Sequence, residues 1–132
     1  MPTKDLALPA LTTIVALITY FVLTLNVGRA RGKFNVPAPQ TSGNPDFERV
    51  LRVQQNTVEQ IILFLPSLWL CALFTSPKLA AGLGGVWILG RILYAWGYYK
   101  AAEKRGPGFG IALLSTLSLL IGSIYGVITT LL

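Results

Sequence analysis

The sequence predicts an all-α protein built as a bundle of four transmembrane helices. Of its 132 residues, 53% are hydrophobic and 12% are charged, a charged share about half that of a typical soluble domain. The mean hydropathy is +0.62. The charged residues lie in short segments between four apolar stretches, and a helix needs roughly 20 apolar residues to cross a hydrocarbon core of about 30 Å. Both observations indicate an integral membrane protein that forms a single domain over residues 1–132.

The composition also excludes several classes of function. A net charge of +6 and a pI near 9.8 are compatible with nucleic-acid binding, but the basic residues cluster beside apolar stretches, and no binding surface of basic and aromatic residues is evident. We therefore expect no nucleic-acid partner. The chain has no histidine and a single cysteine, Cys71, which lies in an apolar run. These counts exclude a disulfide framework, Ser–His or Cys–His catalysis and a histidine-ligated metal, and no metal cofactor is expected.

The first predicted helix covers residues 6–28, which are 23 uncharged residues between Asp5 and Arg29. This length suits one full membrane span. It exceeds the apolar core of a secretory signal peptide, and no small-residue cleavage site follows it, so the helix is expected to remain in the mature protein. Arg29, Arg31 and Lys33 come directly after it, where cations suit a helix C-terminus that faces anionic lipid headgroups.

A loop rich in proline and glycine, FNVPAPQTSGNP, separates this helix from the second one, predicted over residues 45–74. Asn44 is a suitable N-cap for that helix, Pro45 suits its first turn, and Asp46 suits the positive end of its dipole. Pro66 lies inside the helix, where it removes one backbone hydrogen bond and is expected to cause a kink. A Thr-Ser-Pro turn ends the helix.

Four polar residues form one face of the second helix. They are Arg49, Arg52, Asn56 and Glu59, at spacings of i, i+3, i+7 and i+10. The segment that follows, residues 60–77, is uncharged but only 18 residues long, so this polar face is expected at or just inside the membrane boundary. Polar groups at that depth are expected to form a functional site. The alternative is a structural role, in which the amide and the carboxylate join helices and the arginines anchor the helix among lipid headgroups.

The third helix is predicted over residues 79–104 and has one charge, Arg91, near its middle, which should therefore face protein rather than lipid. At about 100° per residue, Tyr94 and Tyr98 share a stripe with Arg91, and Arg105 returns to that stripe if the helix continues. The stripe is a second polar face. The alternative is an interfacial aromatic belt with a snorkelling arginine.

A Gly-Pro-Gly sequence at residues 106–108 is expected to end the third helix. The chain then finishes with 27 uncharged residues, counted from residue 106, which give a fourth helix over residues 108–131.

The distribution of basic residues predicts the orientation in the membrane. Eight of them flank the spans on the side of the first and third loops: Arg29, Arg31, Lys33, Arg49, Arg52, Lys100, Lys104 and Arg105. Only Lys4 and Lys78 flank the other side. By the positive-inside rule, the first and third loops are cytoplasmic and both termini lie on the opposite side. A site formed by the two polar faces would then be cytoplasmic as well.

Three segments together resemble a known family. They are ARGKF after the first helix, FERVLRVQQNTVEQ at the start of the second and GRILYAWGYYKAAEKRGPG on the third. With the four-span plan, they are similar to the membrane-associated proteins in eicosanoid and glutathione metabolism, a family that includes the microsomal glutathione transferases. The resemblance covers the chain from Arg29 to Gly108. It is specific, because the second segment fixes five polar residues in one helix near the membrane boundary.

The resemblance implies a homotrimer, with glutathione bound between subunits near the cytoplasmic side. It assigns a set of residues to the glutathione pocket: Arg31, Arg52, Gln54, Asn56, Glu59, Tyr94 and Tyr98. It gives Arg105 the role of the arginine that activates the thiol, with Tyr98 as a further catalytic candidate. Two positions differ from other branches of the family. Gln60 replaces a tyrosine, and Gly32 replaces a second consecutive arginine, which disfavours leukotriene synthesis.

The chemistry of glutathione suits these residue types. Glutathione has two carboxylates, one ammonium and one thiol, and arginine offers a planar fork to a carboxylate, so Arg31 and Arg52 are reasonable clamps. Glu59 is the acid able to meet the ammonium, while Asn56 can serve either partner. The thiol has an ordinary pKa of about 8.5, and a guanidinium at Arg105 would favour its reactive anion.

The sequence therefore predicts a membrane-bound glutathione transferase that conjugates glutathione to hydrophobic electrophiles, with reduction of lipid hydroperoxides as a further activity. The electrophile would reach the thiolate from the bilayer, so membrane lipids are also expected partners. One alternative is a non-catalytic relative that holds a lipid for another enzyme. A second alternative is a small four-helix multidrug transporter, but those proteins have an acid within the first helix, and residues 6–28 contain none.

Overall fold

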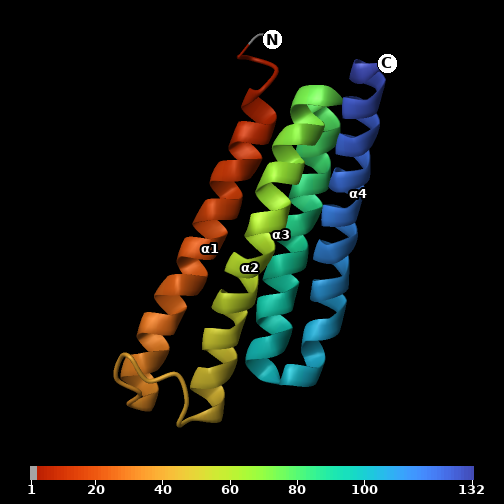
Figure 1. Ribbon diagram of the computed structural model, residues 1–132. Coiled ribbons are helices and arrows are strands. Elements are labelled where there is room, and N and C mark those ends of the chain that lie inside the picture. Colours follow the sequence, from red (N-terminus) through yellow and green to blue (C-terminus); the bar gives the residue numbers. More distant parts are fainter. Residues whose placement is uncertain (1–2) are drawn as a thin grey trace.

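The computed structural model describes residues 3–132 and consists there of four long α-helices and one short 3-10 helix, without a strand. The long helices run side by side (Figure 1). Their bounds are Ala7–Phe34 for α1, Pro45–Phe74 for α2, Pro77–Lys100 for α3 and Gly106–Leu131 for α4, and the 3-10 helix η1 is Ala102–Arg105. The predicted all-α, four-helix fold is confirmed.

The helices are long and apolar enough to cross a membrane. Each of the four spans found in residues 3–132 contains an 18-residue window with a mean hydropathy of at least 1.2. The outward surface carries large apolar side chains, such as Ile62 and Ile121, which are 70% and 67% exposed. A water-soluble domain rarely exposes so much contiguous apolar surface. The protein is therefore an integral, multi-pass membrane protein.

The helices alternate in direction along the bundle. Figure 1 shows the start of α1 and the end of α4 at the same end of the bundle as the turn between α2 and α3. The opposite end holds the connection from α1 to α2 and the connection from α3 to α4. We call this opposite end, formed by residues 35–44 and 101–105, the loop end.

Helix α1 ends later than the sequence suggests. It was expected to end at residue 28, but it continues to Phe34 and contains Arg31 and Lys33 in its last turn. It stops where Asn35 adopts a left-handed backbone conformation, with φ at 57°, which is a common way to end a helix. Polar residues mark where the helix leaves the hydrocarbon, but they do not break its hydrogen bonds.

Helix α2 occupies residues 45–74, the range that the capping residues indicate. The Asn44 side chain accepts a hydrogen bond of 3.0 Å from the backbone N–H of Phe47, and Pro45 lies in the first turn. This cap satisfies one of the N–H groups that a helix leaves unpaired at its start. Pro66 lies inside the helix, which continues past it without interruption.

The prediction that the third helix continues to residue 104 is wrong. Helix α3 ends at Lys100, Ala101 is extended with φ at −164° and ψ at 143°, and residues 102–105 form η1. The Gly-Pro-Gly sequence does not mark the break. It lies in the first turn of α4, which begins at Gly106. Proline fits there because the backbone N–H groups of the first turn have no partner within the helix, so its missing N–H costs no hydrogen bond.

The core of the bundle joins α2, α3 and α4. The rings of Phe64 and Trp87 stack with their centroids 4.0 Å apart, and both side chains are buried among Leu68 and Leu119. Nearer the loop end, α3 and α4 approach so closely that a Cβ atom at Gly108 would lie 2.7 Å from the carbonyl oxygen of Gly90. Glycine is therefore required at this crossing.

Candidate active site

A polar pocket lies near the loop end of the bundle, with a volume of about 460 Å³. Residues from α2, α3, η1 and α4 line it: Arg52, Asn56, Tyr94, Tyr98, Arg105 and Phe109. We use the name polar pocket for this set. The structure thus brings together five of the residues that the sequence assigns to the site, and they come from both predicted polar faces.

Arg52 lies at the rim of the polar pocket and pairs with Glu59. One of its terminal nitrogens, Nη1, donates to Oε1 of Glu59 at 2.9 Å, and the two side chains are 45% and 54% exposed. The two residues are two helical turns apart on one face of α2. An exposed ion pair of this kind contributes little to stability. Both charges therefore remain available to a ligand that bears an acid and an ammonium.

Arg105 reaches the polar pocket from η1 rather than from an extended α3. Its Nη1 donates to the carbonyl oxygen of Ala102 at 2.6 Å, and its guanidinium lies 5.6 Å from the centre of the Tyr98 ring. Tyr98 in turn makes an edge contact with Tyr94, with ring centroids 5.5 Å apart. One guanidinium and two phenols thus line a single wall of the pocket.

Arg91 lies directly behind this wall and is fully buried. Its Nη2 donates to Oδ1 of Asn56 and to Oγ1 of Thr57, each at 2.8 Å. Its guanidinium carbon lies 4.1 Å from the centre of the Tyr94 ring. The prediction that Arg91 faces protein is confirmed, and its two contacts with Asn56 and Tyr94 connect it to the pocket lining.

Two residues assigned to the glutathione pocket lie elsewhere in this protomer. Gln54 faces α1, where its Nε2 donates to the hydroxyl of Tyr20 at 2.9 Å. Arg31 holds the loop after α1, where it donates to the carbonyl oxygens of Val36 and Gln40. On a helix, Gln54 and Arg52 are about 200° apart, so they point to opposite sides of α2. One ligand held inside one protomer cannot meet both.

A second polar hollow of about 400 Å³ adjoins the first and shares Arg52 and Tyr98 with it. It also includes Arg49, which the sequence places on the polar face of α2, and Glu48. Arg49 forms an ion pair with Asp46 in the first turn of α2. The polar face of α2 is therefore divided, with Arg49 in this second hollow and Asn56 in the polar pocket.

The sequence did not single out Phe109 as part of the site. It lines the polar pocket from the first turns of α4, with its ring centre 6.1 Å from that of Tyr94. An aromatic residue in an apolar stretch has no feature that separates a pocket-facing position from a lipid-facing one. Only the start of α4 at Gly106, directly after η1, places this residue beside the two tyrosines.

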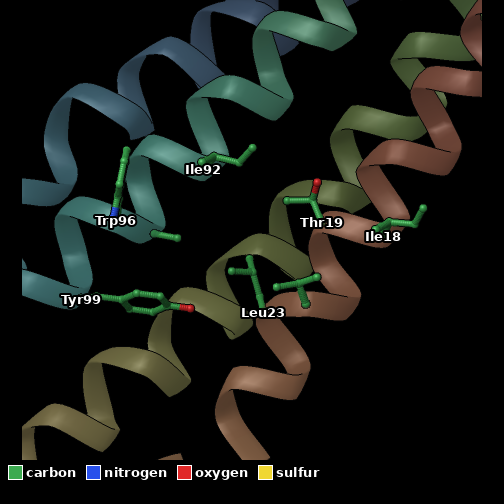
Figure 2. Close-up of a pocket in the computed structure, with 8 residues that line it drawn as sticks. Ile18, Thr19, Leu23, Ile92, Trp96 and Tyr99 are labelled. Carbon is green, nitrogen blue, oxygen red and sulfur yellow. The ribbon is translucent and has the colours of Figure 1, made fainter. Parts of the chain in front are cut away.

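An apolar groove of about 360 Å³ lies on a different face of α3, between α3 and α1 (Figure 2). Eight residues line it: Ile18, Thr19, Val22, Leu23, Ile92, Ala95, Trp96 and Tyr99. The Tyr99 hydroxyl accepts a hydrogen bond of 3.2 Å from Asn26. The groove contains no charged residue, unlike the polar pocket and the hollow beside it.

Comparisons with known proteins connect this geometry to a family. The sequence model of the MAPEG family matches residues 9–125. An uncharacterized protein of Synechocystis is 56% identical over 128 residues, which are 97% of this chain and 93% of that protein. Human microsomal glutathione S-transferase 2 is 46% identical over 104 residues, 77% of this chain and 69% of the human protein. Leukotriene C4 synthase of Cavia porcellus is 38% identical over 101 residues, 76% of this chain and 67% of that protein.

Proposed function

This chain belongs to the MAPEG family, and from that premise we propose that it is a membrane-bound glutathione transferase that conjugates glutathione to hydrophobic electrophiles. The observation that supports this function best is the polar pocket. Two arginines, two phenols and an amide meet there at the end of an otherwise apolar bundle. The names of the human and Cavia porcellus relatives, a glutathione S-transferase and a leukotriene C4 synthase, agree with it.

The residues in and beside the pocket match the groups of glutathione. Arg52 is placed to bind a carboxylate in a forked geometry. Glu59, its ion-pair partner at the rim, is placed to bind the ammonium. When glutathione enters, the Arg52–Glu59 pair opens and each member exchanges its partner for a group of the ligand. Because the pair is exposed, this exchange costs little.

Arg105 and Tyr98 are the groups that we assign to the thiol. A thiol with a pKa of about 8.5 is mostly protonated at neutral pH, and the thiolate is the nucleophile. Lowering that pKa by about two units requires roughly 2.7 kcal/mol of differential stabilisation of the anion. A guanidinium in a partly water-excluded pocket can supply this amount. The chain's own residues thus bind and activate the nucleophile, and glutathione provides it.

The reaction then balances without a further cofactor. The thiol proton leaves to solvent, the thiolate sulfur attacks an electrophilic carbon, and a carbon–sulfur bond forms as the leaving group departs with its electron pair. We also propose reduction of lipid hydroperoxides. In that reaction two glutathione molecules are oxidised to the disulfide, while the hydroperoxide is reduced to an alcohol and water. Hydrophobic acceptors of either kind would come from the surrounding bilayer.

We propose a homotrimer, with the site between subunits. The positions of Gln54 and Arg31 support an intersubunit site, because neither lines the polar pocket or the hollow beside it together with Arg52 of the same protomer. Both can do so if a neighbouring copy packs its α1 and α2 surface against the mouth of the polar pocket. The number of three subunits comes from the resemblance to the family.

Native mass spectrometry in detergent, with and without glutathione, tests the site and the assembly together. We expect a trimer that binds glutathione, and we expect Arg52→Ala and Asn56→Ala to weaken that binding about tenfold each. Val58→Ala is the matched control, because Val58 is a partly exposed α2 residue outside the pocket. Unchanged affinity in both polar variants would contradict the pocket, and a monomer that turns over substrate would contradict the intersubunit site.

A further inference from the structure

The buried arginine behind the pocket has no part in the function proposed so far. Arg91 lies in the middle of α3, fully buried, and within residues 3–132 it forms no ion pair. A buried cation without an acid is costly to keep. Its contacts are instead an amide oxygen, a hydroxyl and the face of a tyrosine ring, from Asn56, Thr57 and Tyr94. Two of these three residues line the polar pocket.

The chemistry of arginine fixes which way the Asn56 amide points. A guanidinium has only donors, so the Asn56 atom 2.8 Å from Nη2 of Arg91 must be the oxygen. An asparagine amide is otherwise ambiguous, because its oxygen and nitrogen look alike and must be assigned from their partners. With the oxygen held by Arg91, the NH₂ group is the half of Asn56 that remains for the pocket.

We propose that Arg91 is a positioning residue that orients Asn56, so that the oxygen of this amide faces Arg91 and its NH₂ group is the half offered to the polar pocket. Resting on the proposed function, this means that Asn56 binds a carboxylate or peptide carbonyl oxygen of glutathione and does not bind its ammonium. The ammonium is left to Glu59. Asn56 and Arg52 then act together as an oxygen-binding pair, one turn apart on α2.

Arg91 is itself held in place from two further sides. Thr57 provides a second acceptor for the same nitrogen, and its own hydroxyl donates to the carbonyl oxygen of Val53 at 2.8 Å. The Tyr94 ring covers the guanidinium from a distance of 4.1 Å, a cation–π contact that partly compensates the buried charge. Each contact restricts the guanidinium, so the Asn56 amide cannot rotate without losing its partner.

The first experiment needs no glutathione. Thermal unfolding is measured for Arg91→Met, Asn56→Ala and the double variant in detergent. Arg91→Met leaves the Asn56 oxygen without its donor, and Asn56→Ala removes one of the two acceptors of Arg91, whereas the double change removes both groups. We expect the double variant to lose clearly less in melting temperature than the sum of the two single losses. Additive losses would overturn the proposal, whether or not the protein binds glutathione.

The second experiment measures glutathione affinity and turnover in the same variants. We expect Arg91→Met to raise the Kd about tenfold, as Asn56→Ala does, and to change it less than twofold in the Asn56→Ala background. Turnover at saturating glutathione should change little, and Arg91→Lys should restore part of the affinity because lysine can donate to the same oxygen. A purely structural role for Arg91 would lower affinity and turnover in both backgrounds.

Thr57→Val is the matched control, since it removes the other acceptor of Arg91 from a buried position outside the pocket lining. Its glutathione Kd should rise clearly less than in Arg91→Met, because Arg91 keeps its contacts with Asn56 and Tyr94. A tenfold rise in this variant would overturn the specific link between Arg91 and Asn56.

Asn56→Asp keeps the proposal testable if Arg91→Met fails to fold, because the new carboxylate still pairs with Arg91. It replaces the NH₂ group by an acceptor, so glutathione affinity should fall. Tighter binding would mean that glutathione donates a hydrogen bond to the side chain at position 56, which overturns the proposal. If the unfolding cycle shows coupling but the wild type binds no glutathione, the proposed function is wrong and Arg91 still orients Asn56.

Discussion

Arg105 is the residue whose role can be separated most sharply from simple binding. Its guanidinium lies beside the Tyr98 ring at the edge of the polar pocket, while Arg52 and Glu59, which we assign to a carboxylate and the ammonium, lie on α2. Its contribution should therefore concern the thiolate and leave most of the affinity unchanged.

We expect Arg105→Ala to raise the pKa of bound glutathione toward its ordinary value of about 8.5 and to lower kcat at neutral pH by at least tenfold. The measurement is ultraviolet thiolate absorbance against pH, with glutathione bound and no electrophile. Arg105→Lys should recover part of the effect, because a lysine point charge lacks the fixed fork of donors.

Lys104→Ala is the control for lost positive charge, since Lys104 is an exposed cation next to Arg105 in η1. It should leave the thiol titration unchanged. Identical titration curves for the wild type and Arg105→Ala would assign Arg105 to headgroup anchoring, and the thiolate role would pass to Tyr98 or Arg52.

At the residue scale, helical spacing predicts which side chains share a face but not which faces meet. The stripe of Arg91, Tyr94 and Tyr98 follows from their positions in α3. The contact between Arg91 and Asn56 depends on the register of α3 against α2, which the sequence does not reveal. For the same reason the position of Gln54 against α1 was not predicted.

At the element scale, the crossing of α3 and α4 holds the tyrosine wall of the pocket. A Cβ atom at Gly108 would lie 2.5 Å from the Cα atom of Tyr94, a contact too short for a real side chain. The two helices would have to separate, and Tyr94 would move with α3.

We expect Gly108→Ala to lower the free energy of unfolding by about 1–3 kcal/mol, as overpacking does, and to weaken glutathione binding. Gly110→Ala is the matched control on the same helix, because a Cβ atom there meets nothing within 4 Å. Thermal unfolding and glutathione titration should separate the two variants. Equal losses in both would show that the close approach is not the cause.

The helices themselves were predictable where local chemistry marks their ends. The Asn44 cap and Pro45 fix the start of α2, and both act through the backbone of the first turn. The end of α3 was missed because nothing local in the Ala-Ala-Glu-Lys-Arg segment disfavours a helix. The chain leaves the helix at Ala101 and η1 folds back against α3, where Lys104 packs on Gly97; such a tertiary contact has no local signal in the sequence.

At the scale of the whole molecule, the excess of basic residues at the loop end supports a cytoplasmic location for that end and for the polar pocket. Single-cysteine variants test this orientation. We expect a membrane-impermeant maleimide to label Ser42→Cys from the cytoplasmic side only and Leu132→Cys from the opposite side only, because both positions are exposed. The native Cys71 is buried, so the unmodified chain is the control for background labelling. The reverse pattern would place the pocket outside the cytoplasm.

The hydrogen bonds of Arg91 also have a consequence for biogenesis. The membrane-spanning window of α3 has a mean hydropathy of 1.4, below the values of 1.7 for α2 and 2.1 for α1 and α4, and a mid-span arginine opposes insertion by about 2.5–3.5 kcal/mol. The acceptors of that arginine lie on α2, and only the two residues Thr75 and Ser76 separate α2 from α3. We therefore expect the translocon to release α2 and α3 into the bilayer as one hairpin. In a glycosylation-reporter assay, α3 alone should insert less well than the hairpin, and equal insertion would show that Arg91 needs no partner during synthesis.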